Sequence, residues 1–345
     1  MAIGDPERAT QNRMIAQLCG DTSGKVGGLG WRYLGDWQKR EGNANIEPSL
    51  LRPWLIARGH DPEVATKAIA ELQRAARMDG LKLYEANRAT YDMLRYGVQV
   101  TPGPGEAPVT VRFVDWDNPA ANDLGLAEEV AVTAKNPKAY NKRPDLVMYV
   151  NGIAMGVVEL KKSTVDLGAG IRQTLDNQRP KFIRHFFTTV QITFAGNDMQ
   201  GLRYAAIQTP QPYWLAWKEE SAIPNPLDRD VAQMLAPARF LELINDFILF
   251  DAGIKKVTRP NQYFAVKAGR AGAVSHRPRA LSARDHGCAV PRSPGPAHHL
   301  HEGRAGGRDR GRQQLDRLRD PPCTGADAGS AALLGTGQTH FAGPS

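Results

Sequence analysis

The sequence is short of cysteine and of long hydrophobic runs, and each shortage excludes a class of protein. Cys19, Cys288 and Cys323 lie far apart and lack the close spacing of metal ligands. They therefore predict neither a disulfide scaffold nor a zinc finger, and they suit a reducing compartment. No apolar run approaches the ~20 residues of a membrane span, and the N-terminal stretch MAIGDPERATQNRM has no apolar signal-peptide core. We therefore expect a cytoplasmic protein that does not associate with a membrane.

The last part of the chain lacks the residue types that build a hydrophobic core. After Lys267 there is no Lys, Ile, Met, Asn, Trp or Tyr, whereas 11 Arg and 13 of the 34 Gly fall there. Such a segment buries too little apolar surface to offset the entropy of ordering it. We therefore expect residues 268–345 to be a disordered, low-complexity tail rich in Arg, Gly and Pro.

Two interpretations of this tail stay open. One is an arginine-rich segment that binds nucleic acid through its charge. The other, which we favour, is a GC-rich gene translated in the wrong frame, because Arg, Gly, Ala and Pro have GC-rich codons and the missing residue types do not. The formal net charge of the whole chain is +8, and the uneven placement of this excess makes it a weak indication of a polyanionic partner.

The rest of the sequence predicts an α+β fold, with a mixed β-sheet flanked by helices. Residues 1–30 are polar and glycine-rich, which predicts a flexible N-terminus without a long element. Helices are predicted after Pro48 and Pro62, over residues 87–94, over residues 170–177 and around Phe240. Strands are predicted within 98–117, over 128–134, and in four later segments, at 143–162, 188–197, 204–207 and 213–217.

The segment RPDLVMYVNGIAMGVVELKK, residues 143–162, is the most informative stretch of the chain. Two apolar runs, Leu146–Val150 and Ala154–Leu160, are separated by Asn151 and Gly152, a pair typical of tight hairpin turns. Charged residues appear only where one edge of this hairpin emerges.

The register of the hairpin decides what these charged residues can do. A two-residue turn alone would place Asp145 opposite Val158, with Asp145 and Glu159 on opposite faces. A three-residue loop, or a bulge with the same effect, places Asp145 opposite Glu159. Lys161 then shares their face, because side chains alternate along a strand.

In the second register the residues match the requirements of metal-assisted phosphodiester hydrolysis. Two facing carboxylates, Asp145 and Glu159, repel each other unless a hard cation such as Mg²⁺ lies between them. Lys161 is then placed to stabilise charge that develops on a phosphate, and Gln173 on the next helix to contact the phosphate or a water. The alternative is an ordinary strand pair that ends in solvent with a surface ion pair.

Taken together, these residues resemble a known family. RPDLVMYVNGIAMGVVELKKS is similar to the nuclease core of the R (restriction, motor) subunit of type I restriction enzymes, which belongs to the PD-(D/E)xK nucleases. LYEANRATYDMLRYGVQV, VRFVDWDNPAANDLGL and RPNQYFAV resemble other segments of that subunit in the same order. The resemblance implies a PD-(D/E)xK endonuclease-like domain over residues 31–222.

The resemblance also implies roles for single residues. Asp145 and Glu159 are expected to hold Mg²⁺, Lys161 to be the catalytic lysine, and Gln173 to be the glutamine of the Gln-x-x-x-Tyr motif of the family. Asn177 stands where that motif has tyrosine, which puts the contribution of the tyrosine in doubt.

Further residues are expected around this site. Contacts to DNA phosphates are expected from Lys142, Arg143, Lys162 and Arg172, with a solvated basic rim as the alternative. An upstream carboxylate often completes such sites, and the sequence offers Asp36 and Glu85 without choosing between them.

Residues 223–267 are expected to be a linker and helical lead-in to an ATPase motor, in which Gln262 would meet the adenine of ATP. The phosphate loop of such a motor, G-x-x-x-x-G-K-[ST], occurs nowhere in the 345 residues. We therefore expect a subunit truncated before its motor, in which ATP belongs only to an intact family member and is not hydrolysed by this chain.

The sequence thus predicts the nuclease domain of a type I R subunit. Its expected reaction is Mg²⁺-dependent hydrolysis of double-stranded DNA, and its expected partners are methylase and specificity subunits. Two alternatives remain: a catalytically decayed module that binds DNA or docks to subunits, and a basic protein that binds nucleic acid through its arginine-rich tail.

Overall fold

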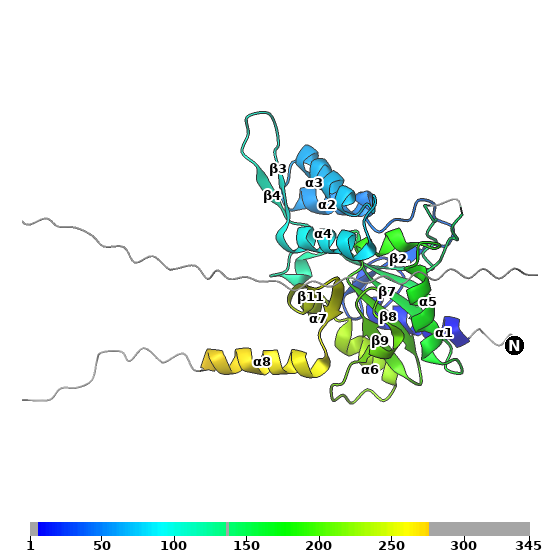
Figure 1. Ribbon diagram of the computed structural model, residues 1–345. Helices are drawn as coiled ribbons and strands as arrows, with labels where there is room; N and C mark the ends of the chain where they lie inside the picture. Colours follow the sequence, from blue (N-terminus) through cyan, green and yellow to red (C-terminus); the bar gives the residue numbers. More distant parts are fainter. Residues whose placement is uncertain (1–5, 136–137, 276–345) are drawn as a thin grey trace, which may run out of the picture. The chain divides into compact units, whose positions relative to one another are not determined.

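The computed structural model describes residues 6–135 and 138–275, and in this part of the chain a mixed β-sheet is flanked by helices (Figure 1). The sheet has eight strands in the order β1-β2-β5-β6-β7-β8-β9-β10. β2 pairs with β5, and β7 with β8, in parallel; the other neighbours are antiparallel. The predicted α+β class is therefore confirmed. The strands of the sheet are β1 (Val26–Gly27), β2 (Trp31–Asp36), β5 (Leu124–Glu128), β6 (Leu146–Val150), β7 (Ile153–Leu160), β8 (Ile192–Asn197), β9 (Gly201–Ala205) and β10 (Leu215–Ala216).

The helices begin largely where the sequence places start signals. Asp61 caps α3 by accepting hydrogen bonds from the backbone N–H groups of Glu63 and Val64, and a proline opens several of the helices. The α-helices are α1 (Pro6–Cys19), α2 (Pro48–Ala57), α3 (Pro62–Ala75), α4 (Leu83–Tyr96), α5 (Leu167–Asn177), α6 (Pro226–Met234), α7 (Pro237–Asp246) and α8 (Pro260–Ser275). Short 3₁₀ helices lie at Pro119–Ala121, Arg184–Thr188 and Gln211–Tyr213. In the described residues no helix is both long and apolar enough to cross a bilayer.

Two hairpins lie outside the sheet. β3 (Val98–Val100) pairs with β4 (Val109–Val111) around the predicted Pro/Gly loop, and β11 (Ile248–Asp251) pairs with β12 (Ile254–Val257). The second hairpin carries Lys255, a lysine that is almost completely buried.

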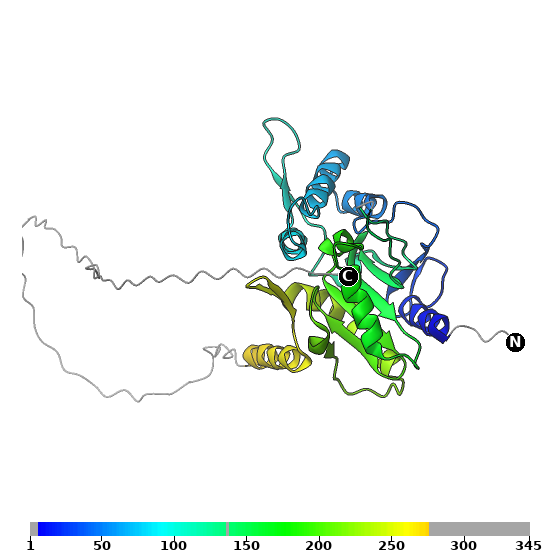
Figure 2. The ribbon, with the colours of Figure 1, turned by 45° about the vertical axis from the view of Figure 1, so that its right-hand side comes forward.

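The core lies on both faces of the sheet, which explains why the central strands are apolar throughout. Every residue of β6 and β7 is buried. Phe240 of α7 packs edge-on against Trp31, with 5.6 Å between the ring centroids, and also contacts Phe194. Residues 223–267, expected as a linker and lead-in, thus contribute to the same core. Figure 2 shows α5 lying along the sheet, where it packs on β7 and β8.

The expectation that residues 1–30 contain no long element is wrong. α1 occupies Pro6–Cys19, with Met14 and Leu18 buried. Its polar side chains are stabilised by partners distant in sequence: Arg13 pairs with both Asp198 and Asp228. Tertiary contacts of this kind leave no local signal.

Two other boundaries also differ from the predictions. The strand expected over residues 128–134 is instead β5, Leu124–Glu128, and it ends where Glu129 takes a left-handed conformation with φ of 51°. α8 continues past Lys267 to Ser275. The remainder of the predicted tail, residues 276–345, lies outside the described residues.

Candidate active site

The hairpin of β6 and β7 has a two-residue turn and a bulge. Asn151 and Gly152 both have positive φ, 53° and 80°, as a type I′ turn requires, and Val150 pairs with Ile153. The register then shifts by one residue at Met155, so that Leu146 pairs with Val158. This bulge has the effect that the predicted chemistry requires, because the next pair along the hairpin is Asp145 and Glu159.

The bulge is held by the segment that precedes β8. The carbonyl of Met155 accepts a hydrogen bond from the backbone N–H of Gln191 (2.8 Å), and the carbonyl of Ala154 accepts one from the Thr189 hydroxyl (2.8 Å). The side chain of Gln191 in turn accepts a hydrogen bond from the Lys255 ammonium (2.6 Å). The extra residue in β7 is therefore fixed by partners from two distant segments.

Asp145 and Glu159 form a close pair of carboxyl groups. Glu159 is completely buried, whereas Asp145 keeps some exposure and accepts a hydrogen bond from the backbone N–H of Leu160 (2.6 Å). Burial raises the pKa of Asp145 to about 6, although the Leu160 N–H and Lys161 act in the opposite direction. Burial also raises the pKa of Glu159 well above its usual range, and the neighbouring Asp145 adds to this rise.

Two amides from α5 hold the Glu159 carboxyl group. Gln173 Nε2 donates to Glu159 Oε2 (2.7 Å), and Asn177 Nδ2 donates to Glu159 Oε1 (3.0 Å). The two residues lie one helical turn apart, on the same face. Asn177 Oδ1 is buried and has no hydrogen-bond partner among the described residues. The asparagine at the expected tyrosine position therefore contacts Glu159 directly.

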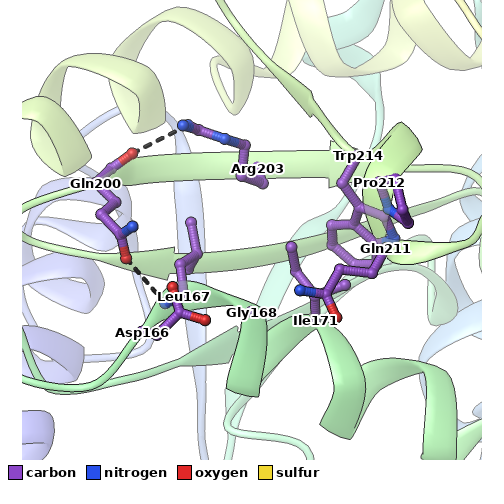
Figure 3. A pocket seen from close by; sticks show the side chains of 9 residues that line it. All are labelled: Asp166, Leu167, Gly168, Ile171, Gln200, Arg203, Gln211, Pro212 and Trp214. Atoms are coloured by element: carbon purple, nitrogen blue, oxygen red, sulfur yellow. Dashed lines mark hydrogen bonds between the residues drawn. The ribbon is translucent and has the colours of Figure 1, made fainter.

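α5 lies close enough to the sheet for these contacts because of Gly170. A Cβ atom at this position would lie only 3.3 Å from Lys161 Cγ and 3.5 Å from Ala195 Cβ. The start of the helix is held by Gln200, whose side-chain oxygen accepts a hydrogen bond from the Leu167 N–H (2.8 Å), as Figure 3 shows. The preceding Asp166 makes no such side-chain bond.

A cavity of about 340 Å³ lies beside another face of the same helix (Figure 3). Leu167, Ile171 and Trp214 supply its apolar wall, and Gln200 and Arg203 lie at its edge. None of the predicted catalytic residues lines it. Helix α5 thus separates this cavity from the carboxyl pair.

Lys161 and an unpredicted carboxylate complete the cluster. Lys161 Nζ lies 2.6 Å from the carbonyl oxygen of Leu160 and 3.2 Å from Oε1 of Glu7, in the first turn of α1. Burial acts to lower the pKa of Lys161, but Asp145, Glu159 and Glu7 together raise it above its usual value. The ammonium therefore stays charged.

Glu7 is a carboxylate upstream of Asp145 that contacts Lys161 and that the sequence did not identify. The two candidates have local hydrogen-bond partners: Asp36, at the end of β2, accepts a hydrogen bond from the Gln38 N–H, and Glu85, in the first turn of α4, accepts one from the Lys82 N–H. The only sequence signal for Glu7 is its place just after Pro6, which suits the first turn of a helix.

The predicted phosphate-contacting cations border the cluster. Arg143 pairs with Glu129 (2.7 Å), and Lys142 lies over the ring of Phe182, 4.2 Å from its centroid. Lys162 follows Lys161 and is exposed, and Arg172 is exposed on α5 with a contact to Gln211 (3.3 Å). Gln262 lies at the start of α8, and its side chain accepts a hydrogen bond from the Arg259 N–H (3.0 Å). This is a local contact with none of the residues of the cluster.

The two carboxyl groups of the cluster are hard oxygen donors, the kind of group that binds magnesium. Across residues 6–135 and 138–275, no three His, Cys, Asp or Glu side chains are grouped to hold a metal ion. Magnesium is usually bound by one or two carboxylates, with waters and substrate phosphates filling its other positions. Asp145 and Glu159 are two carboxyl groups of this kind, and the Leu160 carbonyl is a neighbouring oxygen that contacts the Lys161 ammonium.

Comparisons with known proteins identify the family of the chain. Residues 24–212 match the family described as the type I restriction enzyme R protein N terminus. A putative type I restriction enzyme MjaVIIP endonuclease subunit from Methanocaldococcus jannaschii is 27% identical over 199 residues, 51% of this chain and 17% of that protein. The SauMSSORF170P endonuclease subunit from Staphylococcus aureus (strain MSSA476) is 24% identical over 207 residues, 57% of this chain and 21% of that protein.

A longer match covers more of the chain. The putative MjaVIIIP endonuclease subunit, also from M. jannaschii, is 23% identical over 261 residues, 69% of this chain and 24% of that protein. The chain therefore spans about a fifth of the length of the curated relatives it matches. Because the family match covers more than half of its residues, the chain belongs to the family of type I restriction enzyme R protein N-terminal regions.

Proposed function

We propose that this chain supplies the nuclease of a type I restriction enzyme, and that it hydrolyses phosphodiester bonds of double-stranded DNA with Mg²⁺. The observation that carries the proposal is the bulge at Met155, which places Asp145 opposite Glu159 at the end of the hairpin that leads into Lys161. Family membership gives the biological setting, since the relatives are named as endonuclease subunits.

The metal would be held by Asp145 and Glu159, with the Leu160 carbonyl as a further oxygen donor. Two buried carboxyl groups with raised pKa values are unfavourable as neighbouring anions, and a bound cation favours their ionised form. When bound, Mg²⁺ supplies positive charge that polarises a phosphate and lowers the pKa of water.

The protein side chains supply the remaining parts of the mechanism. Lys161 keeps a positive charge close to the carboxyl pair, where it stabilises negative charge that develops on the phosphate. Gln173 and Asn177 fix both oxygens of Glu159, so that the carboxylate is oriented before substrate arrives. Glu7 holds Lys161 from α1 and thereby positions its ammonium group.

The wider assembly is also a proposal. In type I systems of this family we expect methylase and specificity subunits as partners and ATP-driven movement of DNA toward the nuclease. The 345 residues contain no phosphate-loop motif, so we expect purified chain to cleave without hydrolysing ATP. The predicted adenine contact of Gln262 is then relevant only where a motor is present.

A plasmid-nicking assay with purified chain tests the proposal. Supercoiled DNA should be nicked in Mg²⁺ and left intact in EDTA, and Glu159→Ala should lower the rate by at least about a hundredfold, because it removes a metal ligand. Glu106→Ala, in the exposed loop between β3 and β4, serves as the matched control and should cleave normally. Cleavage that survives Glu159→Ala would show that the carboxyl pair is not the active site.

A catalytically decayed module remains the second candidate, because Asn177 replaces the family tyrosine. It predicts that the chain binds DNA but does not nick it at any Mg²⁺ concentration. Asn177→Tyr then gives a direct comparison: cleavage that appears only in this variant would assign the loss to that position.

A further inference from the structure

Two segments next to the carboxyl pair are unusually rich in positive charge. Residues 133–143 and 178–185 contain seven Lys and Arg and no Asp or Glu. By contrast, the formal charge of the entire 345-residue chain is only +8. Such a concentration of positive charge on two segments indicates a polyanionic partner at this position.

Contacts between the two segments bring their aromatic residues together. The backbone N–H of Tyr140 donates to the carbonyl oxygen of Lys181 (2.9 Å), and the ring of Tyr140 lies 6.0 Å from that of Phe182, between centroids. Lys142 Nζ lies 4.2 Å and Lys181 Nζ 5.1 Å from the centroid of Phe182. We call these four residues, Tyr140, Lys142, Lys181 and Phe182, the cation–aromatic platform.

The platform is available to a ligand. Tyr140 is 66% exposed, although its ring rests on Phe182, and Lys181 is exposed. In the described part of the chain neither Lys142 nor Lys181 forms an ion pair with a carboxylate, whereas Arg143 and Arg179 nearby pair with Glu129 and Asp176. The two ammonium groups thus remain free to bind phosphate while they stay over an aromatic ring.

The platform lies beside the proposed cleavage site. Lys142 forms a bridge with Val132 and is three residues from Asp145, a separation of at most about 10 Å along an extended chain. Successive bases of a strand are about 3.4 Å apart along the helix axis. Tyr140 is five residues from Asp145, a separation of at most about 17 Å along an extended chain. A strand whose phosphate lies at Asp145 therefore has a base within reach of Tyr140 no more than about five nucleotides away.

We propose that the cation–aromatic platform binds an unpaired nucleotide of the DNA strand next to the cleaved bond. Tyr140 would stack on the base, and Lys142 and Lys181 would bind the flanking phosphates. Paired bases inside a duplex present no free ring face, so stacking on an exposed tyrosine requires a frayed or extruded base. This inference rests on the proposed function, since it identifies the state of the DNA that this site receives.

DNA binding measured by fluorescence anisotropy in EDTA tests the inference independently of cleavage. The probes are a short blunt duplex and the same duplex with a single-stranded overhang of either polarity. Tyr140→Ala should weaken binding of the overhang DNA about five- to tenfold and binding of the blunt DNA less than about twofold, because it removes base stacking. Tyr140→Phe should bind as wild type, since it keeps the ring.

Two controls separate stacking and charge from general damage. Tyr96→Ala removes a tyrosine that is also 66% exposed, at the end of α4, and should leave both affinities unchanged. The Lys142→Ala, Lys181→Ala double variant should weaken both DNAs and reduce the salt dependence of binding by about one to two ions. Lys218→Ala, at an exposed lysine elsewhere, should have no effect on the salt dependence.

The outcomes distinguish this inference from the proposed nuclease. Equal loss on both DNAs in Tyr140→Ala, no loss on either, or no binding by wild type would overturn the platform, even if the chain nicks plasmid. Selective loss of overhang binding would support the platform even if no nicking is detected, because EDTA removes the metal from the measurement.

Discussion

Glu159 and Lys255 are both buried ionisable residues, but their surroundings differ in a way that separates function from stability. The Lys255 ammonium donates to Gln191 Oε1 (2.6 Å) and Asn87 Oδ1 (2.8 Å), which are neutral acceptors, and burial lowers its pKa well below the usual value. Glu159 also has two amide partners, yet it lies beside a second carboxyl group, Asp145, which raises its pKa further. The hydrogen-bond partners of Lys255 are neutral, whereas the carboxyl pair keeps a like-charge repulsion that the neighbouring Lys161 offsets only in part.

The two sites are linked by a single residue. Gln191 accepts a hydrogen bond from Lys255 with its side chain and donates one to the bulged Met155 with its backbone. The register that brings Asp145 opposite Glu159 is thus supported from the side by the buried lysine. The buried lysine thus supports, through Gln191, the register of a carboxyl pair in which charge repulsion remains.

The largest expected effect is on stability, from Lys255→Ala. This change leaves the side-chain oxygens of Gln191 and Asn87 buried without their donor, which costs about 3 kcal/mol in the free energy of unfolding. For a domain of this size the melting temperature should fall by about 10 °C in thermal unfolding. Lys256→Ala is the matched control, since the neighbouring lysine is half exposed in a surface pair with Asp251.

The comparison fails if both lysine variants unfold at the same temperature. Lys255→Met adds a second check, because it fills the same space with an apolar chain but also lacks the donor. If Lys255→Met is as stable as wild type, packing rather than hydrogen bonding is what the buried lysine contributes.

The sequence predicted the carboxyl pair but not the feature that creates it. Asn151 and Gly152 identify the turn, and from this turn alone the register would place Asp145 opposite Val158. The bulge at Met155 corrects the register, and it is held by Gln191, which is 36 positions further along the chain. A contact between residues so far apart cannot be recognised from the residue types around the bulge. The sequence therefore showed that a bulge or a longer loop was needed, but not at which residue the bulge lies.

A second expected effect is on catalysis, from Asn177→Ala. Without its amide, Glu159 Oε1 loses a hydrogen bond that favours the ionised carboxylate, so the pKa of Glu159 should rise further. We expect cleavage at neutral pH to fall about tenfold and the pH of half-maximal activity to rise by about one unit. The measurement is the nicking rate as a function of pH, in Mg²⁺.

Gln178→Ala is the control for that measurement. Gln178 is the next residue along the chain and is also buried, but it bonds to Thr174 and Gln208 instead of Glu159. Its loss should lower stability and leave the pH profile in place. A profile that shifts equally in both variants would mean that Asn177 acts through the helix and not through Glu159.

The helix α1 and the contact of Glu7 with Lys161 could not be predicted from the sequence either, because both depend on contacts with residues far along the chain. Nothing in the first 30 residues except Pro6 marks a helix. The helix is held by the burial of Met14 and Leu18 and by the ion pairs of Arg13 with Asp198 and Asp228. Glu7 then reaches Lys161, 154 positions away. The helices with strong periodicity and caps, such as α3, were in contrast predictable from their own residues.

A smaller effect is expected from Asp145→Asn, on the free energy of unfolding measured in the absence of metal. Folding raises the pKa of Asp145 from 3.8 to about 6, so the folded state holds a proton that the unfolded state releases. The destabilisation of the folded state is therefore absent below pH 4, grows as the pH rises, and is complete above about pH 6, where it is at most about 3 kcal/mol. Asp145→Asn removes this destabilisation, because the amide carries no charge, and it keeps a side-chain oxygen that accepts the hydrogen bond from the Leu160 N–H.

Thermal unfolding at two pH values measures this difference. In EDTA, Asp145→Asn should melt several degrees above wild type at pH 7 and at about the same temperature at pH 4. Adding Mg²⁺ should raise the melting temperature of wild type and have much less effect on the variant. A variant that melts below wild type at pH 7 would contradict the view that the carboxyl pair is strained without a cation.

The smallest expected effect concerns an exposed cation, Arg172. Arg172 is exposed, and within the part of the chain that the structure describes its guanidinium makes one long hydrogen bond, to Gln211 (3.3 Å). Unlike Lys255, it therefore contributes little to stability. If it binds a DNA phosphate, Arg172→Ala should weaken duplex binding about two- to threefold, equally for all sequences, and lower the salt dependence by about one ion, with no change in melting temperature. Anisotropy titrations over a range of salt concentrations measure both quantities. An unchanged salt dependence would place Arg172 on a solvated rim outside the DNA path, and the cations that bind the strand would then be those on the Lys142 side of the carboxyl pair.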